Sequence, residues 1–301
     1  MKQFLTILFS VAMTMAACAC NRKADMDYSD FYKEKDDGKQ EIEESRQIAV
    51  MSFNVKNNVD NVETEYTWGI RCKGVYAMLN QVAPAVVGLQ ECYLDQREDI
   101  LQNCKAYKGY GVGRDNGSSS GESASILYRT DVIAMKEYGT FWLSETPETP
   151  SLGWDARFNR TCTWARFTHL PSGEDFFFFN THLDHVGTTA REKSAQLILQ
   201  KIDELNPTGL PVFLTGDMNC REGSVPIASF SAVLSNARPD TDRIPTSHSW
   251  GTASSQIDFI FYSGITEKRY ETIDDSFDGM TYISDHYPIL GEFLFNEKAE
   301  E

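Results

Sequence analysis

Six short apolar segments, spread along the chain, each end or begin beside a side chain that can bind a cation, carry a proton or donate a hydrogen bond. These segments read IAVMSFN, AVVGLQE, DFFFFNTH, PVFLTGD, DFIF and YPIL. Apolar runs of about four to eight residues are typical of buried strands rather than of helices. A chain with so many buried strands must pack them into sheets whose faces are covered.

Amphipathic segments lie between these strands. Residues 68–82 read WGIRCKGVYAMLNQV, in which Ile70, Gly74 and Met78 recur at helical spacing, and Pro84 ends the pattern. This recurrence predicts a helix between the first two strands.

Two further helices and a hairpin complete the pattern. A short helix is expected over 94–101, and a longer one begins at 189–192, where T-x-x-E predicts a capping box before an apolar face. TCTWARFTHL and DFFFFNTHL flank Pro-Ser-Gly, which predicts a hairpin. Helices recur between strands, so we expect a layered α/β or α+β domain with two packed sheets and outer helices.

The first residues are typical of an export signal. Lys2 gives a charged start, and residues 4–15 form an apolar run too short to span a membrane. The run ends in Met-Ala-Ala-Cys, which resembles the lipobox of bacterial lipoproteins and predicts a lipid on Cys18, with Cys20 as the alternative position. An ordinary signal peptide cleaved nearby is the other interpretation. We therefore expect an exported protein that only a lipid anchor holds to a membrane, at the periplasmic face or the cell surface.

The domain organisation follows from these features. We expect a signal peptide over 1–17, a lipidated flexible tether over 18–47, one folded domain over 48–296 and a short tail over 297–301. The tether is polar and charged, with little to bury. Hydrophobic residues make up 41% of the 301-residue chain, which suffices for one substantial core.

Charge and cysteine content restrict the partners. The formal net charge is −16, which repels a polyanion at long range and disfavours avid binding to duplex DNA, although a local basic groove would still permit it. The cysteines beyond the leader are odd in number and show no CxxC spacing, so a zinc–cysteine site is not expected, while one or two disulfides would be compatible with export. These cysteines are Cys72, Cys92, Cys104, Cys162 and Cys220. We expect a monomer.

The polar residues at the strand ends are the candidates for a functional site. Each has a structural alternative, because asparagine and aspartate are common in turns, a glutamate can cap a helix and an aspartate can pair with an arginine. Polar groups are costly to bury singly, however, and strand ends are where open sheets place their sites. The set comprises Asn54, Glu91, Asn180, His182, Asp217, Asn219, Asp258, Asp285 and His286.

The ordered motifs MSFN, LQE, NTHLDH, GDMN, IDFIF and SDHYP together resemble the endonuclease/exonuclease/phosphatase superfamily, over about residues 48–295. That superfamily includes DNase I-like nucleases, bacterial sphingomyelinases, inositol polyphosphate 5-phosphatases and poly(A) deadenylases. GVGRDNGSSSGES and FWLSETP resemble segments of a bacterial lipoprotein branch of it. The resemblance implies a DNase I-like, four-layer sandwich of two mixed sheets flanked by helices, with the site at one edge.

The resemblance also implies a metal site. Glu91 would be the principal Mg²⁺ ligand, with Asn54 beside it, and Asp285 would complete the metal or imidazole network. Mg²⁺ prefers oxygen ligands and keeps several waters, so one or two carboxylates and the substrate phosphate suffice. Mn²⁺ is the alternative cation.

The remaining motif positions carry implied catalytic roles. Asp217 and Asn219 would orient the attacking water or bind metal and phosphate, and Asp258 would hold His286. His182 would face His286 across the scissile phosphate. Imidazole has a reference pKa of about 6.5 and suits proton transfer at neutral pH.

The segment NTHLDH has further candidates. His182 is expected to bind or protonate the phosphate and Asn180 to hydrogen-bond it. The spacing identifies no carboxylate partner for His182, although Asp184 lies on the same face of the extended chain and is a weaker candidate for orienting it or binding metal. His185 is expected only to support the loop.

The loops supply candidate substrate contacts. Arg114 is the strongly basic residue of the glycine-rich segment over 110–123 and would bind phosphate, unless it is a solvated loop residue. Aromatic residues of the loop-like segment over 141–155 would stack on a sugar or base, although core packing is the stronger interpretation. These aromatic residues are Phe141, Trp142 and Trp154, and the weaker candidates for the pocket rim are Arg157, Arg160 and His248.

These features favour a secreted, lipid-anchored, Mg²⁺-dependent phosphoester hydrolase that acts on a small or single phosphorylated group. An extracellular endonuclease or exonuclease is the alternative enzyme. A lipoprotein that binds phosphorylated ligands without turning them over is the alternative of a different class.

Overall fold

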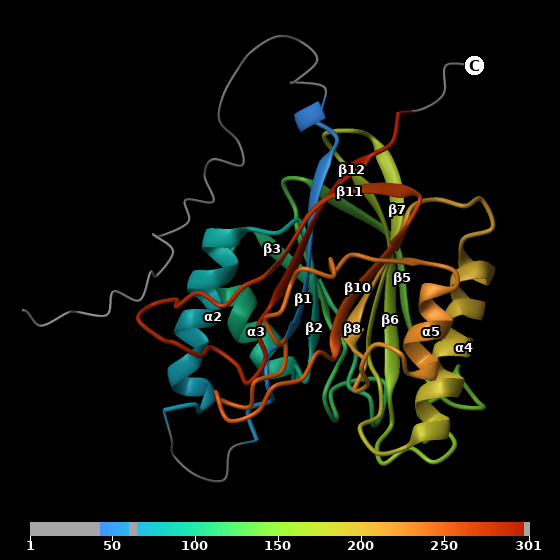
Figure 1. Ribbon diagram of the computed structural model, residues 1–301, viewed down its shortest axis with the longest axis horizontal. Coiled ribbons are helices and arrows are strands. Elements are labelled where there is room, and N and C mark those ends of the chain that lie inside the picture. The colour runs from blue at the N-terminus through green and yellow to red at the C-terminus, as the bar shows by residue number, and fades with distance from the viewer. Residues whose placement is uncertain (1–42, 60–64, 298–301) are drawn as a thin grey trace, which may run out of the picture. The chain divides into compact units, whose positions relative to one another are not determined.

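A computed structural model of the chain describes residues 43–59 and 65–297. Two six-stranded sheets form the centre of this part of the chain (Figure 1). The first sheet has the order β11 (Ile265–Thr272), β12 (Ile289–Phe295), β1 (Gln47–Asn54), β2 (Val86–Gln90), β4 (Ile126–Arg129) and β3 (Tyr107–Tyr110). The second has the order β5 (Ile133–Trp142), β6 (Thr161–His169), β7 (Glu174–His182), β8 (Val212–Asp217), β10 (Asp258–Ser263) and β9 (Ser235–Asn236).

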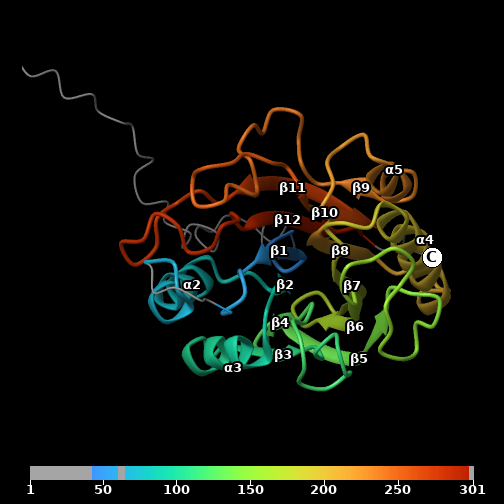
Figure 2. The ribbon, with the colours of Figure 1, turned by 90° about the horizontal axis from the view of Figure 1, so that it is seen from below.

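Helices cover the outer face of each sheet. Helices α2 (Trp68–Val82) and α3 (Leu94–Asn103) pack on the first sheet, and α4 (Thr188–Leu205) and α5 (Val225–Ser231) pack on the second. Figure 2 shows the two sheets side by side, with one helix pair on either outer side. The expected four-layer α+β sandwich of two mixed sheets is therefore confirmed.

The phenylalanine run explains how both faces of β7 are buried. Successive side chains of a strand point to opposite faces. Phe176 and Phe178 therefore join the core between the two sheets, while Phe177 and Phe179 join the core beneath α4 and α5. The same alternation in β1 sends Val50 to the core between the sheets. Strands that are apolar on both faces can exist only inside such a layered structure.

Two parallel strand pairs aim their carboxyl ends in one direction. β1 runs parallel to β2, and β7 runs parallel to β8. The pairing registers place Asn54 opposite Gln90 in the first sheet and His182 opposite Asp217 in the second. The polar residues that follow these strands are thus brought to one edge of the sandwich.

Some local expectations were wrong. No side chain of Thr188 or Thr189 caps α4, because the helix begins one residue earlier than the T-x-x-E pattern, with Gly187 at its N-cap. The carboxylate of Asp155 accepts the hydrogen bonds of the Thr189 and Ala190 N–H groups instead. A residue from a distant loop therefore satisfies the helix end.

The buried face of α2 agrees with the expectation only in part. Gly74 and Met78 are buried, but Ile70 is 48% exposed. Val75 and Leu79, at other positions of the helix, are buried against the first sheet. Residues spaced four apart drift around a helix that has 3.6 residues per turn. Residues at strict four-residue intervals therefore do not all remain on one face.

The cysteines of the described residues are all free. The one or two disulfides that export would permit are therefore not formed among these residues. Burial raises the pKa of the Cys92 thiol to about 12, which makes this thiol unreactive. Among the helices that the structure describes, none combines the length and apolar content that crossing a bilayer requires. The predicted signal peptide and Cys18 lie outside the described residues.

Candidate active site

The ends of strands from both sheets meet at the site. Asp217 at the end of β8 pairs in register with Asp258 at the start of β10. Across the sheets, the Nδ2 of Asn54 donates a hydrogen bond to Asp217 Oδ2, at 3.0 Å, and to Glu91 Oε1, at 3.1 Å. The strand-end residues Asn54, Glu91, Asp217 and Asp258, which are far apart in sequence, therefore form one connected polar group.

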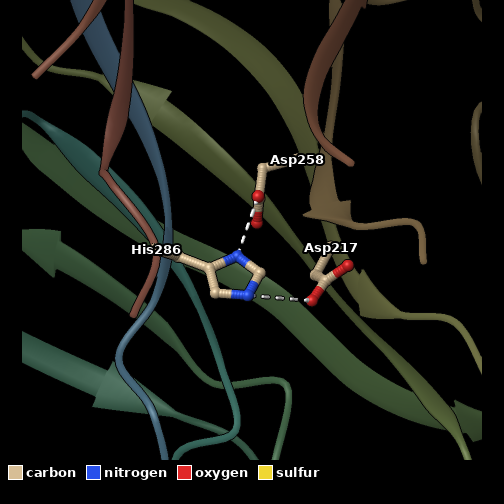
Figure 3. Close-up of side chains that lie close together, drawn as sticks. All are labelled: Asp217, Asp258 and His286. Carbon is tan, nitrogen blue, oxygen red and sulfur yellow. Dashed lines mark hydrogen bonds and ion pairs between the residues drawn. The ribbon is translucent and has the colours of Figure 1, made fainter. Parts of the chain in front are cut away.

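The imidazole of His286 lies between two buried aspartates (Figure 3). Its Nδ1 is 2.9 Å from Asp258 Oδ2, and its Nε2 is 4.0 Å from Asp217 Oδ2. Burial disfavours the imidazolium, but the charges of Asp258, Asp217 and Asp285 outweigh burial and raise the pKa of His286. Burial and the charge of Asp258 raise the pKa of Asp217. The expected Asp258–His286 pairing is present, and it places a cationic ring beside an aspartate that is easier to protonate than usual.

The second imidazole, that of His182, is held in one tautomer. Asn219 Nδ2 donates to Leu183 O and to His182 Nε2, both at 2.9 Å, so the carbonyl fixes the amide orientation and Nε2 must be the acceptor. The ring proton is therefore on Nδ1, which is buried and has no hydrogen-bond partner among the described residues. Burial, Arg160 and Arg114 lower the pKa of His182 well below its usual value, so the ring is neutral. The nearest carboxylate is Asp217, whose Oδ2 is 3.5 Å from Nε2.

Carboxylates and one ammonium group form a third part of the site. Lys56 Nζ is 3.3 Å from Glu91 Oε2 and 3.7 Å from Asp285 Oδ2. Asn57 Nδ2 also donates to Glu91 Oε2, at 2.8 Å. Burial opposes ionisation of Glu91, but Lys56 and Asn54 outweigh it and lower the pKa of Glu91. Glu91 itself has a φ of 54°, a backbone conformation that is strained for a non-glycine residue and that turns its side chain out of the strand direction.

The donor set of this carboxylate group fits a hard divalent cation. Glu91 and Asp285 present oxygen atoms to one point, where Lys56 now supplies the positive charge. Asn54 directs its Nδ2 to the carboxylates, while its Oδ1 accepts a hydrogen bond from the Lys56 N–H. Asn54 thus positions the carboxylates, and its contact with the cation stays a prediction.

A second grouping of ligand atoms is less suited to a metal. Oxygen and nitrogen atoms of Asp217, Asp258 and His286 lie within 4.8 Å of one another. The Nδ1 proton of His286 already occupies the contact with Asp258, however, so this part of the group binds a proton.

Asn180 does not reach the site, contrary to the prediction that it hydrogen-bonds the phosphate. It is fully buried, and its Nδ2 donates to Leu89 O at 2.8 Å and to Ser125 O at 2.9 Å. Its Oδ1 accepts from Gln90 Nε2 at 2.7 Å and from Thr215 Oγ1 at 3.0 Å. All four positions of the carboxamide are used between the two sheets, so Asn180 links the sheets and has no capacity left for a substrate.

A small hollow that is partly open to solvent lies beside these groups. Arg114 lies in its wall, with its Nη1 2.5 Å from Glu122 Oε2 and its guanidinium 4.9 Å from the ring centre of Phe158. Its contact with a phosphate stays a prediction. The lining residues are Glu91, Arg114, Glu122, Ser123, Ala124, Arg160, Thr161 and His182.

Several of the remaining loop candidates are buried side chains that do not lie on the rim of the hollow. Phe141 and Trp142 are buried, and Trp142 Nε1 donates to Arg114 O at 2.7 Å, which anchors the glycine-rich loop. His248 is buried between the rings of Tyr282 and Tyr287, so it does not lie on the rim.

The other candidates lie around Phe158. His185 stacks on Phe158, with ring centres 5.7 Å apart, which agrees with its expected support of the loop. Arg157 is exposed and lies 5.8 Å from the same ring centre. Trp154 is half-buried, with a φ of 47°. Asp184 is buried and paired with Arg160, rather than with His182.

Three site residues were missed from the sequence: Lys56, Asn57 and Glu122. Lys56 and Asn57 lie two and three residues after Asn54, the last residue of β1, and this position was the available signal. Glu122 lies in the glycine-rich loop, where only Arg114 was considered. Its acidic side chain, in contact with Asn57 Nδ2 at 3.2 Å, could not be placed without the fold.

Comparison with known proteins places this geometry in context. A model of the Endonuclease/Exonuclease/phosphatase family matches residues 51–286. A mannosyl-6-phosphatase from Bacteroides thetaiotaomicron is 34% identical, with a TM-score of 0.76 over 82% of this chain and 100% of its own. An endonuclease/exonuclease/phosphatase family protein from the same organism is 33% identical, with a TM-score of 0.77 over 83% of this chain and 98% of its own.

A more distant similarity is to an uncharacterized protein of Acanthamoeba polyphaga mimivirus. The two sequences are 26% identical over 167 residues, which is 51% of this chain. The chain spans 60% of the length of this curated relative.

Proposed function

Because this chain belongs to the endonuclease/exonuclease/phosphatase family, we propose that it hydrolyses phosphoesters with the help of a divalent cation, Mg²⁺ or Mn²⁺. The observation that carries the proposal is the meeting of two acidic groups at one edge of the sandwich. One is the carboxylate pair of Glu91 and Asp285, and the other is the buried group of Asp217, Asp258 and His286.

Glu91 and Asp285 would hold the cation, since both offer carboxylate oxygens at the point that Lys56 now neutralises. When bound, such a cation neutralises negative charge on the phosphoryl oxygens. Lys56 would then move aside or pair with the substrate phosphate.

The buried group would act on the attacking water and the phosphoryl charge. Asp217 would accept the proton of the water, because its raised pKa brings it closer to the operating pH. Asn219 holds that carboxylate through its N–H, at 2.9 Å from Asp217 Oδ1. His286 stays protonated through Asp258 and would stabilise negative charge as it develops. The neutral His182 would donate its Nδ1–H to a phosphoryl oxygen.

The substrate class that we propose is a small phosphorylated molecule, with sugar phosphates as the first candidates. Support comes from the 34% identity to a mannosyl-6-phosphatase and from the small hollow beside His182. The net charge of −16 weighs against a polyanionic substrate.

Release of inorganic phosphate, release of p-nitrophenol and gel electrophoresis of the nucleic acids together test the activity. The purified protein is incubated with p-nitrophenyl phosphate, bis-p-nitrophenyl phosphate, mannose 6-phosphate, plasmid DNA and single-stranded RNA, with Mg²⁺, with Mn²⁺ and with EDTA. We expect turnover of a small phosphoester that EDTA abolishes and Mg²⁺ restores. Cleavage of DNA or RNA alone would favour a nuclease, and binding of these compounds with no turnover of any would favour a binding lipoprotein.

We also propose that the protein is exported and anchored by a lipid on Cys18, on the basis of the apolar run over 4–15 and the Met-Ala-Ala-Cys that follows it. The Cys18→Ser variant should lose incorporation of labelled fatty acid and appear in the soluble fraction. Continued labelling would move the lipid to Cys20, and an absence of labelling in the unmodified protein would contradict the proposal.

A further inference from the structure

Arg160 is a buried cation that the mechanism above does not use. It directly precedes β6, is 5% exposed, and is held on one side by two neighbours. Its Nε is 3.3 Å from Asp184 Oδ2, and its Nη2 is 3.1 Å from His185 Nδ1. Its Nη1 is buried and has no hydrogen-bond partner among the residues that the structure describes.

The partnered side of Arg160 is set by a rigid carboxylate. Asp184 Oδ1 accepts the N–H groups of Val186, at 2.9 Å, and Gly187, at 2.8 Å. Burial opposes its ionisation, but these N–H groups and Arg160 outweigh burial and lower the pKa of Asp184. Asp184 is therefore a fixed anion that orients the guanidinium.

Arg160 lines the hollow, whereas Asp184 and His185 do not. The guanidinium edge that carries the unpartnered Nη1 is therefore the one left for contact with a ligand there. The unpartnered Nδ1 of His182 belongs to another lining residue. Arg114, a third lining residue, also has a buried Nε without a partner among the described residues. Three buried donors without acceptors on the residues of one small hollow call for a ligand that carries several acceptor oxygens, because a buried unpaired donor is costly.

We propose that Arg160 binds a non-bridging oxygen of the substrate's terminal phosphate and thereby makes the site selective for phosphate monoesters. This inference rests on the proposed phosphoester hydrolysis. A phosphate monoester offers three terminal oxygens and nearly two negative charges. These oxygens could contact His182, Arg160 and the cation held by Glu91 at the same time. In a diester, one of these oxygens carries a second substituent and no charge. That substituent would have to fit into a small hollow against a buried guanidinium.

The test compares Arg160→Lys with a matched control, Arg166→Gln. Arg166 lies on β6, the strand that Arg160 precedes, is 35% exposed and pairs with Asp175 and Glu137 outside the site. We measure kcat/KM for p-nitrophenyl phosphate and bis-p-nitrophenyl phosphate, together with the inhibition constant of inorganic phosphate. Arg160→Lys keeps a charge beside Asp184 but loses the second guanidinium nitrogen.

In the unmodified protein, we expect the monoester to be preferred. In Arg160→Lys, kcat/KM for the monoester should fall by about 10- to 100-fold, the loss typical of one hydrogen bond to a charged group. The ratio of monoester to diester turnover should fall at least about tenfold, and phosphate inhibition should weaken similarly. The Arg166→Gln control should retain the ratio and the inhibition constant.

A merely structural role for Arg160 gives a different result. Both esters would then lose turnover together, with the ratio and the phosphate inhibition unchanged, and that outcome or a diester preference in the unmodified protein overturns the inference. If Arg160→Lys does not fold, Asp184→Asn replaces it as the test, because it keeps the guanidinium but loosens its orientation. Asp184→Asn should lower the ratio of monoester to diester turnover, and an unchanged ratio would contradict the inference.

Calorimetric titration with inorganic phosphate separates the two proposals. If the unmodified protein turns over no ester with any cation, the proposed function fails. Phosphate binding that weakens at least about tenfold in Arg160→Lys would still support the anion subsite. Phosphate binding that is equal in the two proteins would exclude it.

Discussion

Replacing the buried Asn180 by aspartate exchanges an NH₂ group for an oxygen of almost the same size. In the native protein, this NH₂ group donates to Leu89 O and Ser125 O, on the opposite sheet. In Asn180→Asp, two carbonyl oxygens would face a carboxylate oxygen, unless the introduced carboxyl group keeps its proton and donates it to one of them. The residue is fully buried, so the protonated form is strongly favoured.

The expected destabilisation can be worked out from this requirement. An unfolded aspartate titrates at about pH 3.9, and each pH unit above that value costs about 1.4 kcal/mol to keep the folded carboxyl protonated. This amounts to about 4 kcal/mol at pH 7 and about 2 kcal/mol at pH 5.5. The carbonyl that loses its donor adds about 1–3 kcal/mol at either pH. The folded pKa is raised, so the deficit grows as pH increases.

Urea unfolding at pH 5.5, 7 and 8 measures this deficit. At pH 7 we expect a loss of about 5 kcal/mol or more and a fall in Tm of about 10–20 °C. The KM of the folded variant, assayed well below its Tm, should stay close to that of the unmodified protein. Asn116→Asp is the matched control, because Asn116 accepts N–H groups of Ser118 and Ser120 through an oxygen that aspartate keeps.

The opposite pattern would refute this reasoning. If Asn180→Asp changed the unfolding free energy by less than about 1 kcal/mol at every pH but raised KM tenfold or more, Asn180 would contact the substrate. The interpretation drawn from NTHLDH would then be right, and the sheet-linking role would be wrong.

Further predictions concern the metal, the histidines and pH. Glu91→Gln should weaken Mg²⁺ activation at least about 10- to 100-fold, with little change in Tm, and a titration of activity against Mg²⁺ checks this. His182→Ala and His286→Ala should each lower kcat by about 10²–10⁴-fold, and the double variant should lose much less than the product if the rings act on one phosphate. Burial lowers the pKa of His169 from 6.5 to about 4, so stability should be complete above pH 6.5 and fall towards pH 4. His169→Phe should remove at most about 3 kcal/mol of that fall, as urea unfolding at both pH values would show.

The layered fold could be predicted from the sequence because its strands are marked by local apolar patterns. A run such as residues 176–179 is apolar at every position, and only a strand between two covering layers can bury both of its faces. The start of α4 was less accessible. Its N–H groups are satisfied by Asp155, more than thirty residues earlier in the chain, and no local pattern encodes such a contact.

The same distinction holds for the site. The ordered motifs, through the family that they resemble, were sufficient to pair Asp258 with His286. They were not sufficient to assign Asn180, since strand alternation places it on the face between the sheets, where only the packed structure reveals four partners. Arg160 was a weak candidate for a similar reason, because its pairing with Asp184 and its unpartnered Nη1 depend on how two loops fold together.

The strand ends that build the site come from both sheets, and this has a consequence for how the protein loses activity. Glu91 and Asn54 follow strands of the first sheet, while Asp217 and Asp258 belong to the second. Any sub-global opening that separates the sheets would dismantle the site before either sheet melts. Turnover should therefore be lost at a denaturant concentration no higher than the one at which the fluorescence of the buried core changes. Residual enzymatic activity would then report the fraction of molecules in which the two sheets remain packed together.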